Sequence, residues 1–394
     1  MDDATLKSYG GDREVFNAVL STSAIDKVLR VARREPPAPG TFPHCTNQGA
    51  SEYIYEPSKW WTSGFFPGSL WAICERASKH PMDGYNLDEV VKLARKWSGR
   101  IEQEQYNTET HDIGFMIMPS FQRDLEVTGA KSCESVIVNA AESLLTRWNE
   151  HVGCIRSWNR TQTHLYCFDC KDTDFLVIID NMMNLDLLYS ASLITGDSKF
   201  ANVATRHTET TLKHHFRKDS STYHLIVYNP VTATPKIGLT HQGYENKSTW
   251  SRGQAWALYG LATVYKYTND QKFLEAAMRA ADYFMSRVDD GVVYWDFDAP
   301  RPCFWDVSAA MIACSGMLLI DQLHGSYTYL PHVTAILRAT INGALTGNDG
   351  CTILDNSTVN NHEHAMKRIT NTGLVYADYY FLEVGNRLLD MGLA

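Results

Sequence analysis

Asp180 is the side chain in this sequence whose surroundings most favour proton transfer. It follows the apolar run 177–179 and precedes Asn181. An aspartate in this position either caps a helix or is a partly desolvated acid, and desolvation raises a carboxyl pKa because it disfavours the charged form. A carboxyl with a raised pKa can donate a proton near neutral pH. The local sequence leaves both interpretations open.

A second candidate acid, Asp112, directly follows His111 and precedes another stretch of small and apolar residues. Two carboxylates that share a pocket are the groups that acid–base chemistry on a sugar requires, as in glycoside hydrolysis. The alternative is again a helix cap, here with a neighbouring histidine. We take Asp180 and Asp112 as the candidate catalytic pair.

The stretch from Gln242 to Trp256 is the richest in groups that bind a ligand. It offers the Gln242 amide and the Trp250 and Trp256 indoles within 15 positions, and Arg252 stands between the two indoles. Indole faces stack on sugar rings, and a guanidinium pairs bidentately with a carboxylate. The alternatives are that both tryptophans belong to the core and that Arg252 forms a structural ion pair with a nearby acid.

Three further features invite a functional interpretation. His224 lies in a strand-like run and could point into a pocket or out to solvent. The segment 362–364 reads His-Glu-His but lacks the spacing of a zinc motif, so we predict a solvated loop. Cys167 and Cys170 form a single CxxC without a matching second pair, which favours structural thiols. We predict no metal site and no cofactor.

Amphipathic helices recur along the chain and would position these residues. Apolar residues at i, i+3 and i+4 spacing, with a charged opposite face, predict outer helices. The segments with this pattern are 15–29, 87–101, 137–148, 200–214, 273–288 and 333–345.

Segments of a second kind alternate with the outer helices. They are apolar on more than one face, which is typical of helices buried between other layers. These segments are 62–77, 113–125, 181–193, 251–267, 307–319 and 373–389. Each begins near a polar or aromatic cluster, and the candidate residues Asp112, Asp180 and Arg252 stand at three of these entrances.

The entrances recur at intervals of 51 to 72 residues, which indicates a repeat of helical hairpins. The repeat is compatible with a closed double ring or an open solenoid. A closed ring would place all six entrances around one pocket, so we predict an all-α, (α/α)6 barrel forming a single domain over residues 1–394. We expect short β segments at the pocket mouth, including 223–228 and 292–295.

Composition narrows the possible partners and the compartment. The net charge of −9 argues against general affinity for nucleic acid or anionic membranes. The first ten residues are acidic and polar, unlike a signal peptide, and no apolar run reaches 18 residues. Nine scattered cysteines fit a reducing compartment. We expect a cytoplasmic monomer or weak homodimer.

Five stretches taken together resemble the unsaturated glucuronyl hydrolases of glycoside hydrolase family 88. They occur in the family's order and span most of the chain. The stretches are Trp61-Thr62-Ser63-Gly64-Phe65, His111-Asp112-Ile113-Gly114-Phe115, Ile178-Ile179-Asp180-Asn181-Met182-Met183-Asn184, Thr240-His241-Gln242-Gly243-Tyr244 and Trp250-Ser251-Arg252-Gly253-Gln254-Ala255-Trp256.

The resemblance implies an (α/α)6 barrel that acts on oligosaccharides left by polysaccharide lyases. Such an enzyme releases the 4,5-unsaturated uronic acid from the non-reducing end by hydrating its C4=C5 vinyl ether. Asp180 matches the family's general acid/base, and Asp112 resembles the second aspartate, which holds ring hydroxyls. The resemblance also implies a substrate-binding set and no cofactor. That set comprises Trp61, His111, His224, Gln242, Trp250, Arg252 and Trp256.

Two other functions remain open at this stage. One is the related unsaturated rhamnogalacturonyl hydrolase activity, which shares the barrel; the stretch 251–256 favours the glucuronyl family over it. The other is a non-catalytic helical scaffold or sugar-binding protein. A scaffold would retain the repeat but gives no reason for both Asp112 and Asp180 to stand at inner-helix entrances.

Overall fold

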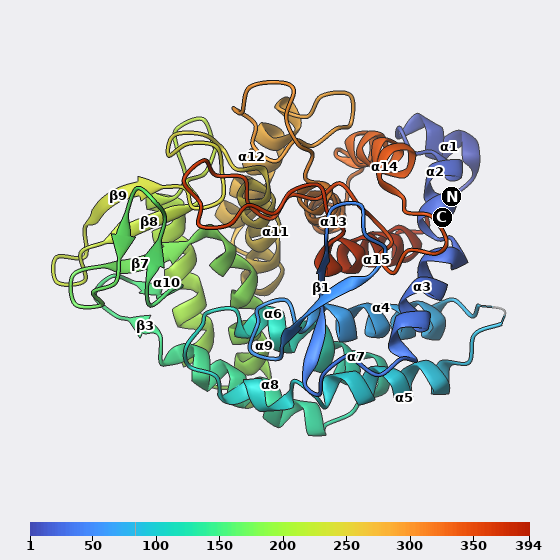
Figure 1. Cartoon of the computed structure of the whole chain (residues 1–394), viewed down its shortest axis with the longest axis horizontal. Coiled ribbons are helices and arrows are strands. Elements are labelled where there is room, and N and C mark those ends of the chain that lie inside the picture. The colour runs from blue at the N-terminus through green and yellow to red at the C-terminus, as the bar shows by residue number, and fades with distance from the viewer. Residues whose placement is uncertain (83) are drawn as a thin grey trace.

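Six inner helical elements form the wall of a barrel in the computed structural model, which describes residues 1–82 and 84–394. Consecutive inner elements contact one another, and the last contacts the first, which closes the ring. In chain order they are α4 (Phe65–Lys79), α6 (Ile113–Ile117) continued by η2 (Met118–Gln122) and α7 (Arg123–Thr128), η3 (Ile179–Asn184) continued by α9 (Leu185–Thr195), α11 (Ser251–Thr268), α13 (Val307–His324) and α15 (Val375–Asp390). The prediction of a closed ring is confirmed (Figure 1).

Outer helices pack against the inner ring. They are α3 (Thr22–Ala32), α5 (Leu87–Ser98), α8 (Ser132–Leu145), α10 (Ser198–His214), α12 (Gln271–Ser286) and α14 (Leu330–Ala344). Each contacts an inner helix next to it in the sequence, as helical hairpins require. Two short helices, α1 (Asp3–Ser8) and α2 (Arg13–Val19), precede them, and η1 (Glu102–Tyr106) is a turn of 3-10 helix. The amphipathic pattern therefore predicted five of the outer helices, whereas segment 15–29 forms two helices, α2 and α3, because the chain breaks at Leu20 and Ser21.

Burial explains why the two layers differ in composition. In α13 every residue from Val307 to Asp321 is buried, whereas α12 buries one stripe of alanines and phenylalanines. By length and composition α13 could cross a membrane, but 83% of it is buried inside the protein, as befits a core helix. The two chain ends meet beside α2, where the Met1 ammonium donates to the Gly392 carbonyl at 3.0 Å.

The second inner element is not the single helix that the pattern over 113–125 predicts. It consists of α6, one π-helical turn and α7. Pro119 lies in the π turn, has no N–H to donate and clashes with the carbonyl of a preceding residue in a regular helix. The π turn accommodates the ring without ending the helix.

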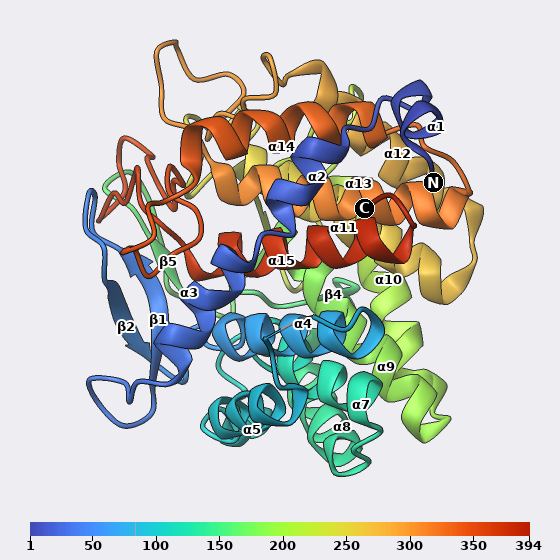
Figure 2. The same ribbon diagram turned by 90° about the vertical axis from the view of Figure 1, so that its right-hand side faces the viewer.

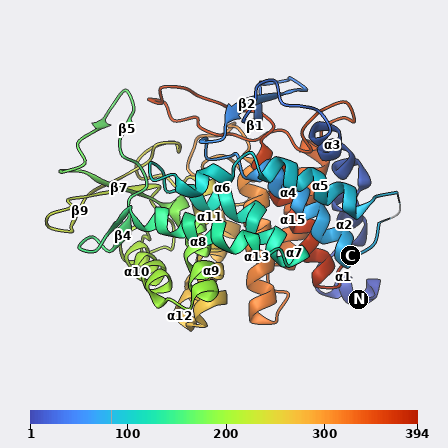
Figure 3. The ribbon, with the colours of Figure 1, turned by 90° about the horizontal axis from the view of Figure 1, so that it is seen from below.

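Short strands gather at the end of the barrel where the inner helices begin (Figures 2 and 3). Antiparallel pairs join β1 (Thr41–Thr46) to β2 (Tyr53–Pro57), β3 (Trp148–Asn149) to β4 (Cys154–Ile155) and β5 (Thr161–Gln162) to β6 (Cys167–Phe168). A three-stranded sheet has the order β7 (Phe175–Ile178), β8 (Leu225–Tyr228) and β9 (Pro235–Leu239).

The two predicted β segments have different outcomes. Segment 223–228 contains β8, as expected. The prediction of a strand at 292–295 is wrong, because Val292 bridges to Asp289 whereas Tyr294 bridges to Trp305. Two bridges to different partners give no continuous ladder.

Candidate active site

Asp180 lies in η3, between the end of β7 and the start of α9, and does not cap a helix. The residues on either side of Asp180 fix its position. The Ile179 backbone N–H donates to the His224 carbonyl at 2.9 Å, and the Asn181 side-chain amide donates to the Ile155 carbonyl at 3.0 Å. Only 9% of Asp180 is exposed, and its buried Oδ1 accepts no hydrogen bond from the described residues. The structure therefore favours the desolvated acid over the helix cap.

The pKa of Asp180 is raised to about 7, chiefly by burial and in smaller part by the nearby Asp112 carboxylate. The Arg252 guanidinium opposes this shift, and so does the Trp256 indole N–H, which faces the carboxyl but makes no hydrogen bond of normal geometry. Because desolvation exceeds these opposing effects, close to half of Asp180 carries a proton at neutral pH. Such a group can donate a proton and then take one back.

His224 directly precedes strand β8, and its side chain points at Asp180. Its Nδ1 accepts the backbone N–H of His241 at 3.0 Å, so the neutral ring carries its proton on Nε2. That Nε2 lies 3.8 Å from Asp180 Oδ1. Burial holds the pKa of His224 well below its usual range, so the ring stays neutral while it faces the acid. The strand-like run therefore directs His224 into the pocket.

Asp112 stands at the entrance of α6 with its side chain 15% exposed and makes no cap bond. Thr110 Oγ1 donates to Asp112 Oδ2 at 2.7 Å, and His111 Nε2 lies 3.3 Å from Asp112 Oδ1. His111 is fully buried, and its Nδ1 donates to the Ser157 carbonyl at 3.0 Å. The Nε2 edge facing Asp112 is therefore the one that gains a proton when His111 ionises.

Glycines and one asparagine bring the entrances close together. A Cβ on Gly64 would lie 2.2 Å from the Phe115 carbonyl oxygen, and one on Gly114 would lie 2.6 Å from Asn184 Oδ1. Asn184 Oδ1 in turn accepts the Phe115 N–H at 3.0 Å. Three consecutive inner elements thus approach one another closely around the two acids. Only glycine fits at these contacts, which explains why Gly64 follows Trp61 and Gly114 follows Asp112.

Arg252 is buried at the start of α11 and is engaged by neighbouring groups. Its guanidinium pairs with Asp306 and donates to the carbonyls of Thr358 and Val359, both at 2.7 Å. Asp306 also caps α13 by accepting the Ser308 N–H at 3.1 Å. The structure therefore contains the ion pair weighed as the alternative for Arg252. A role toward a substrate carboxylate stays a prediction.

Aromatic rings line the space beside the acids. Trp61 is half-buried and packs against Phe115 and Tyr376, with ring centroids 5.6 and 5.0 Å apart. Trp256 is fully buried and contacts Phe115 at 5.1 Å. Trp250 packs on His224 at 4.4 Å between ring centroids. These residues therefore meet at one end of the barrel, although their substrate contacts remain a prediction.

The predicted Gln242 is half-buried and follows His241, which belongs to a cluster of histidine and aromatic rings that the sequence did not predict as a cluster. His241 Nδ1 lies 3.1 Å from the Tyr166 hydroxyl, and its ring packs on Trp158 at 5.2 Å. Trp158 also contacts His224. Only the repeated occurrence of histidine and aromatic residues in these loops hints at this grouping, because the contacts join segments about 80 positions apart.

The prediction of a solvated loop at 362–364 is wrong for His362, which is only 3% exposed. The pKa of His241 is lowered to about 4, chiefly by burial and in part by the charge of His362. The two rings are therefore neighbours. The His164 N–H donates to the His364 carbonyl at 2.8 Å, which joins this loop to the β5–β6 hairpin. Tertiary contact, absent from local spacing, buries His362, whereas Glu363 stays exposed.

Cys167 and Cys170 are free and exposed thiols. They lie on and just after β6, where the chain faces solvent. Within the part of the chain that the structure describes, no group of three or more His, Cys, Asp and Glu residues is arranged to hold a metal ion.

We expect kcat/KM to decline as pH rises through about 7, the pKa of Asp180. The proton donor must be protonated in the free enzyme, so activity is present below that pKa and is lost above it. A pH series of initial rates at subsaturating substrate measures this limb. A profile that stays flat well above pH 7 would show that another group donates the proton.

A barrel of helical hairpins with a buried, protonatable aspartate, a second carboxylate and aromatic walls at one end defines a glycoside hydrolase by fold and site. The comparisons with known proteins agree. Residues 40–292 match the family model described as Glycosyl Hydrolase Family 88. This chain belongs to glycosyl hydrolase family 88.

Individual relatives support the same assignment. An unsaturated glucuronyl hydrolase of Formosa agariphila is 39% identical over 95% of this chain and 91% of its own length. An unsaturated chondroitin disaccharide hydrolase of Streptococcus pneumoniae is 28% identical over 91% and 89%. The crystal structure of an unsaturated glucuronyl hydrolase specific for heparin superposes with a TM-score of 0.83 at 31% identity, covering 98% of this chain and 99% of that one.

Proposed function

We propose that this protein removes a 4,5-unsaturated uronic acid from the non-reducing end of oligosaccharides produced by polysaccharide lyases. The observation that carries the proposal is the state of Asp180, which is buried, accepts no hydrogen bond at Oδ1 from the residues that the structure describes, and has a pKa of about 7. Hydration of a vinyl ether begins with protonation of carbon, which requires a proton donor that is still protonated near neutral pH. Asp180 meets that requirement.

In the first step Asp180 transfers its proton to C4 of the unsaturated ring. The C4=C5 electron pair forms the new C–H bond, and positive charge develops at C5 and the ring oxygen. Asp180 then carries a negative charge close to this cation. The Arg252 guanidinium, which lowers the pKa of Asp180, also favours this ionised form.

In the second step water attacks C5 and gives its proton to the Asp180 carboxylate. The product is a hemiketal, which opens to a C5 ketone. The hemiacetal formed at C1 then releases the shortened sugar. One water molecule is consumed, and Asp180 regains its proton, so the cycle closes without a cofactor.

The remaining groups of the site have supporting roles in this proposal. Asp112, oriented by Thr110 and His111, accepts hydrogen bonds from ring hydroxyls and adds negative charge that raises the pKa of Asp180. Trp61 presents an aromatic face at the more exposed side of the pocket, where a sugar ring can stack. His224 holds its Nε2–H toward Asp180 and keeps the carboxyl oriented.

The parent polysaccharide is a finer question. The relatives named above include enzymes for chondroitin and heparin fragments, so we propose unsaturated glycosaminoglycan disaccharides as first substrates to test. A panel of unsaturated disaccharides from chondroitin, hyaluronan, heparin, glucuronan and pectin, compared by kcat/KM, ranks them directly. Preference for the pectin fragment, prepared from the rhamnogalacturonan part of pectin, would support the related hydrolase activity instead.

We expect incubation with the preferred unsaturated disaccharide to abolish the ultraviolet absorbance of its conjugated C4=C5 bond. Hydration removes the alkene, so the absorbance falls as the keto-uronate forms. The absorbance trace and release of the second sugar should have equal rates. Persistent absorbance with every disaccharide at high enzyme concentration would contradict the enzymatic proposal and favour a sugar-binding scaffold.

A further inference from the structure

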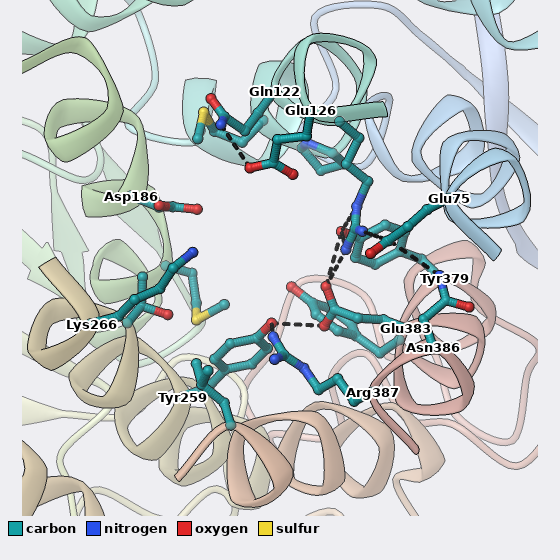
Figure 4. Close-up of a pocket in the computed structure, with 18 of the residues that line it drawn as sticks. Glu75, Gln122, Glu126, Asp186, Tyr259, Lys266, Tyr379, Glu383, Asn386 and Arg387 are labelled. Atoms are coloured by element: carbon teal, nitrogen blue, oxygen red, sulfur yellow. Dashed lines mark hydrogen bonds and ion pairs between the residues drawn. The ribbon is translucent and has the colours of Figure 1, made fainter. Parts of the chain in front are cut away.

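A cavity of about 410 Å³ opens at the opposite end of the barrel, where the inner helices finish. It is lined by residues of α4, α6, η2, α7, η3, α9, α11, α13 and α15. Figure 4 shows that side chains from these helices surround an open centre. The size falls within the range of small-ligand pockets, about 300–1,000 Å³.

The floor of this rear cavity contains buried charges that are bound to one another. Arg123 pairs with Glu75 and Glu383, and Glu383 also accepts the Tyr259 hydroxyl at 2.7 Å. Arg387 donates to the same Tyr259 oxygen at 2.7 Å. The hydrogen-bonding capacity of these groups is therefore largely used by other side chains of the protein.

Two acceptor oxygens on the wall are without a hydrogen bond from the described residues. Asp186 Oδ1 is buried without a hydrogen-bond partner among the described residues, and so is Gln122 Oε1. The Tyr267 hydroxyl hydrogen-bonds Ser190 at 3.2 Å and lies close enough to Asp186 that burial and the Asp186 carboxylate together raise the pKa of Tyr267. In Figure 4 no dashed line reaches Asp186 or Lys266, whose charged ends face the open centre from the same side. An unsatisfied buried acceptor is costly unless a ligand or water supplies the bond.

The rear cavity is separate from the active site. Phe115 lines the cavity, and the same ring packs on Trp61 and Trp256, which face the acids at the other end. Tyr380 lines the cavity as well and packs on Trp256. One layer of aromatic side chains thus divides the barrel interior. Asp180 and Asp112 do not line the rear cavity.

The chemistry of the rear cavity selects among ligands. Asp186 Oδ1 and Gln122 Oε1 require hydrogen-bond donors, and the Lys266 ammonium at the exposed rim can donate to an acceptor. A hydroxyl group does both, and neighbouring hydroxyls of a sugar can satisfy several such groups at once. The rings of Tyr259, Phe115 and Tyr380 supply apolar faces for the C–H faces of a sugar.

Charge distinguishes this site from one for uronates. The lining contains five carboxylates, Glu75, Glu126, Asp186, Glu383 and Asp390, but only three cations, Arg123, Lys266 and Arg387. Their excess negative charge disfavours an anionic sugar. We propose that the rear cavity is a second carbohydrate site, which binds a neutral or amino monosaccharide between Asp186 and Lys266. This site does not depend on the reaction proposed above.

Soaking crystals of the full chain with glucose and with N-acetylglucosamine tests the proposal. We expect density for the sugar between Asp186 and Lys266. In solution, saturation-transfer NMR with the same two sugars should show binding that the double variant Asp186→Ala/Lys266→Ala weakens about tenfold or more. The same variant should keep kcat/KM for the unsaturated disaccharide unchanged, because neither residue belongs to the catalytic pocket.

The matched control is Glu209→Ala/Lys272→Ala, which removes one carboxylate and one ammonium that form an outer surface ion pair. It should leave sugar binding unaltered. If the rear double variant does not fold, the single Lys266→Met change at the exposed rim provides the same comparison. Ordered water alone in the cavity, equal binding by both double variants, tighter binding of glucuronate than of glucose, or occupation by a soaked amino acid in place of the sugars would overturn the proposal.

Discussion

Asp180→Asn should lower kcat/KM about 10²–10⁴-fold, the usual contribution of a general acid. The amide has nearly the same shape as the carboxyl but cannot donate a proton to carbon at neutral pH. Binding should change less than turnover, because the walls made by Trp61 and Trp256 are untouched. Steady-state kinetics on the preferred disaccharide, with binding measured separately, gives both quantities.

The Asp180→Asn variant should fold as well as the wild type, because asparagine lacks the ionisation that makes the stability contribution of Asp180 depend on pH. The folded-state pKa of Asp180, about 7, lies above the value of about 3.9 in an unfolded chain. The favourable contribution of Asp180 to stability is therefore full below the unfolded-state pKa and is lost as pH rises through 7. Since asparagine does not ionise, the variant should be at least as stable as wild type at pH above 7. Thermal unfolding across that range measures the difference.

Asp378→Asn is a matched control for the catalytic variant. Asp378 is also buried, and burial raises its pKa to about 7. It accepts the Tyr53 hydroxyl at 2.8 Å and the Leu354 N–H at 2.9 Å, and we assign it no part in catalysis. This control should retain activity near that of wild type. If Asp180→Asn also retained activity within a few-fold of wild type, the proton donor would have to be another residue.

Arg252→Ala should reduce the free energy of unfolding by about 3–5 kcal/mol, the usual cost of breaking a buried ion pair. The Asp306 carboxylate is fully buried and would lose its cation. The carbonyls of Thr358 and Val359 would also lose their donor. Chemical denaturation followed by circular dichroism measures the loss, provided that the slope of the transition stays constant.

The double variant Arg252→Met/Asp306→Asn separates the ion pair from the rest of the packing. It removes both charges, so stability should recover in part relative to Arg252→Ala. Because Arg252 lowers the pKa of Asp180, either variant that still folds should also move the alkaline limb of the rate profile to higher pH. A loss of stability below about 1 kcal/mol for Arg252→Ala would match an exposed pair rather than a buried one.

The site illustrates which signals are readable in a sequence. His111, Asp112, Asp180, Arg252 and the tryptophans stand at helix entrances because the repeat of hairpins places them there. Residue type and repeat position were therefore sufficient to bring them together in a prediction. His362 was misjudged, because its burial depends on the β5–β6 hairpin, whose contacting residue His164 is about 200 positions away in the sequence.

The neighbouring residues in the sequence could not reveal the protonation state of Asp180. They could not reveal the ion-pair and hydrogen-bond partners of Arg252 either. A carboxyl after an apolar run is compatible with a cap or an acid, and the outcome depends on whether backbone N–H groups reach it. In the structure the η3 turn points the carboxyl toward His224 instead of the helix amides. The pairing of Arg252 with Asp306 likewise depends on how α11 packs against α13.

The sequence by itself determined the alternating helices and the inner-helix entrances that hold the acids, because apolar periodicity and entrance residues are local and repeat along the chain. Only the tertiary structure decided that Asp180 is desolvated without a cap bond, that Arg252 is paired with Asp306, and that a second cavity opens behind Phe115. Desolvation, ion pairing and unfilled space all depend on distances between segments far apart in the chain. Those distances exist only after the helices have packed.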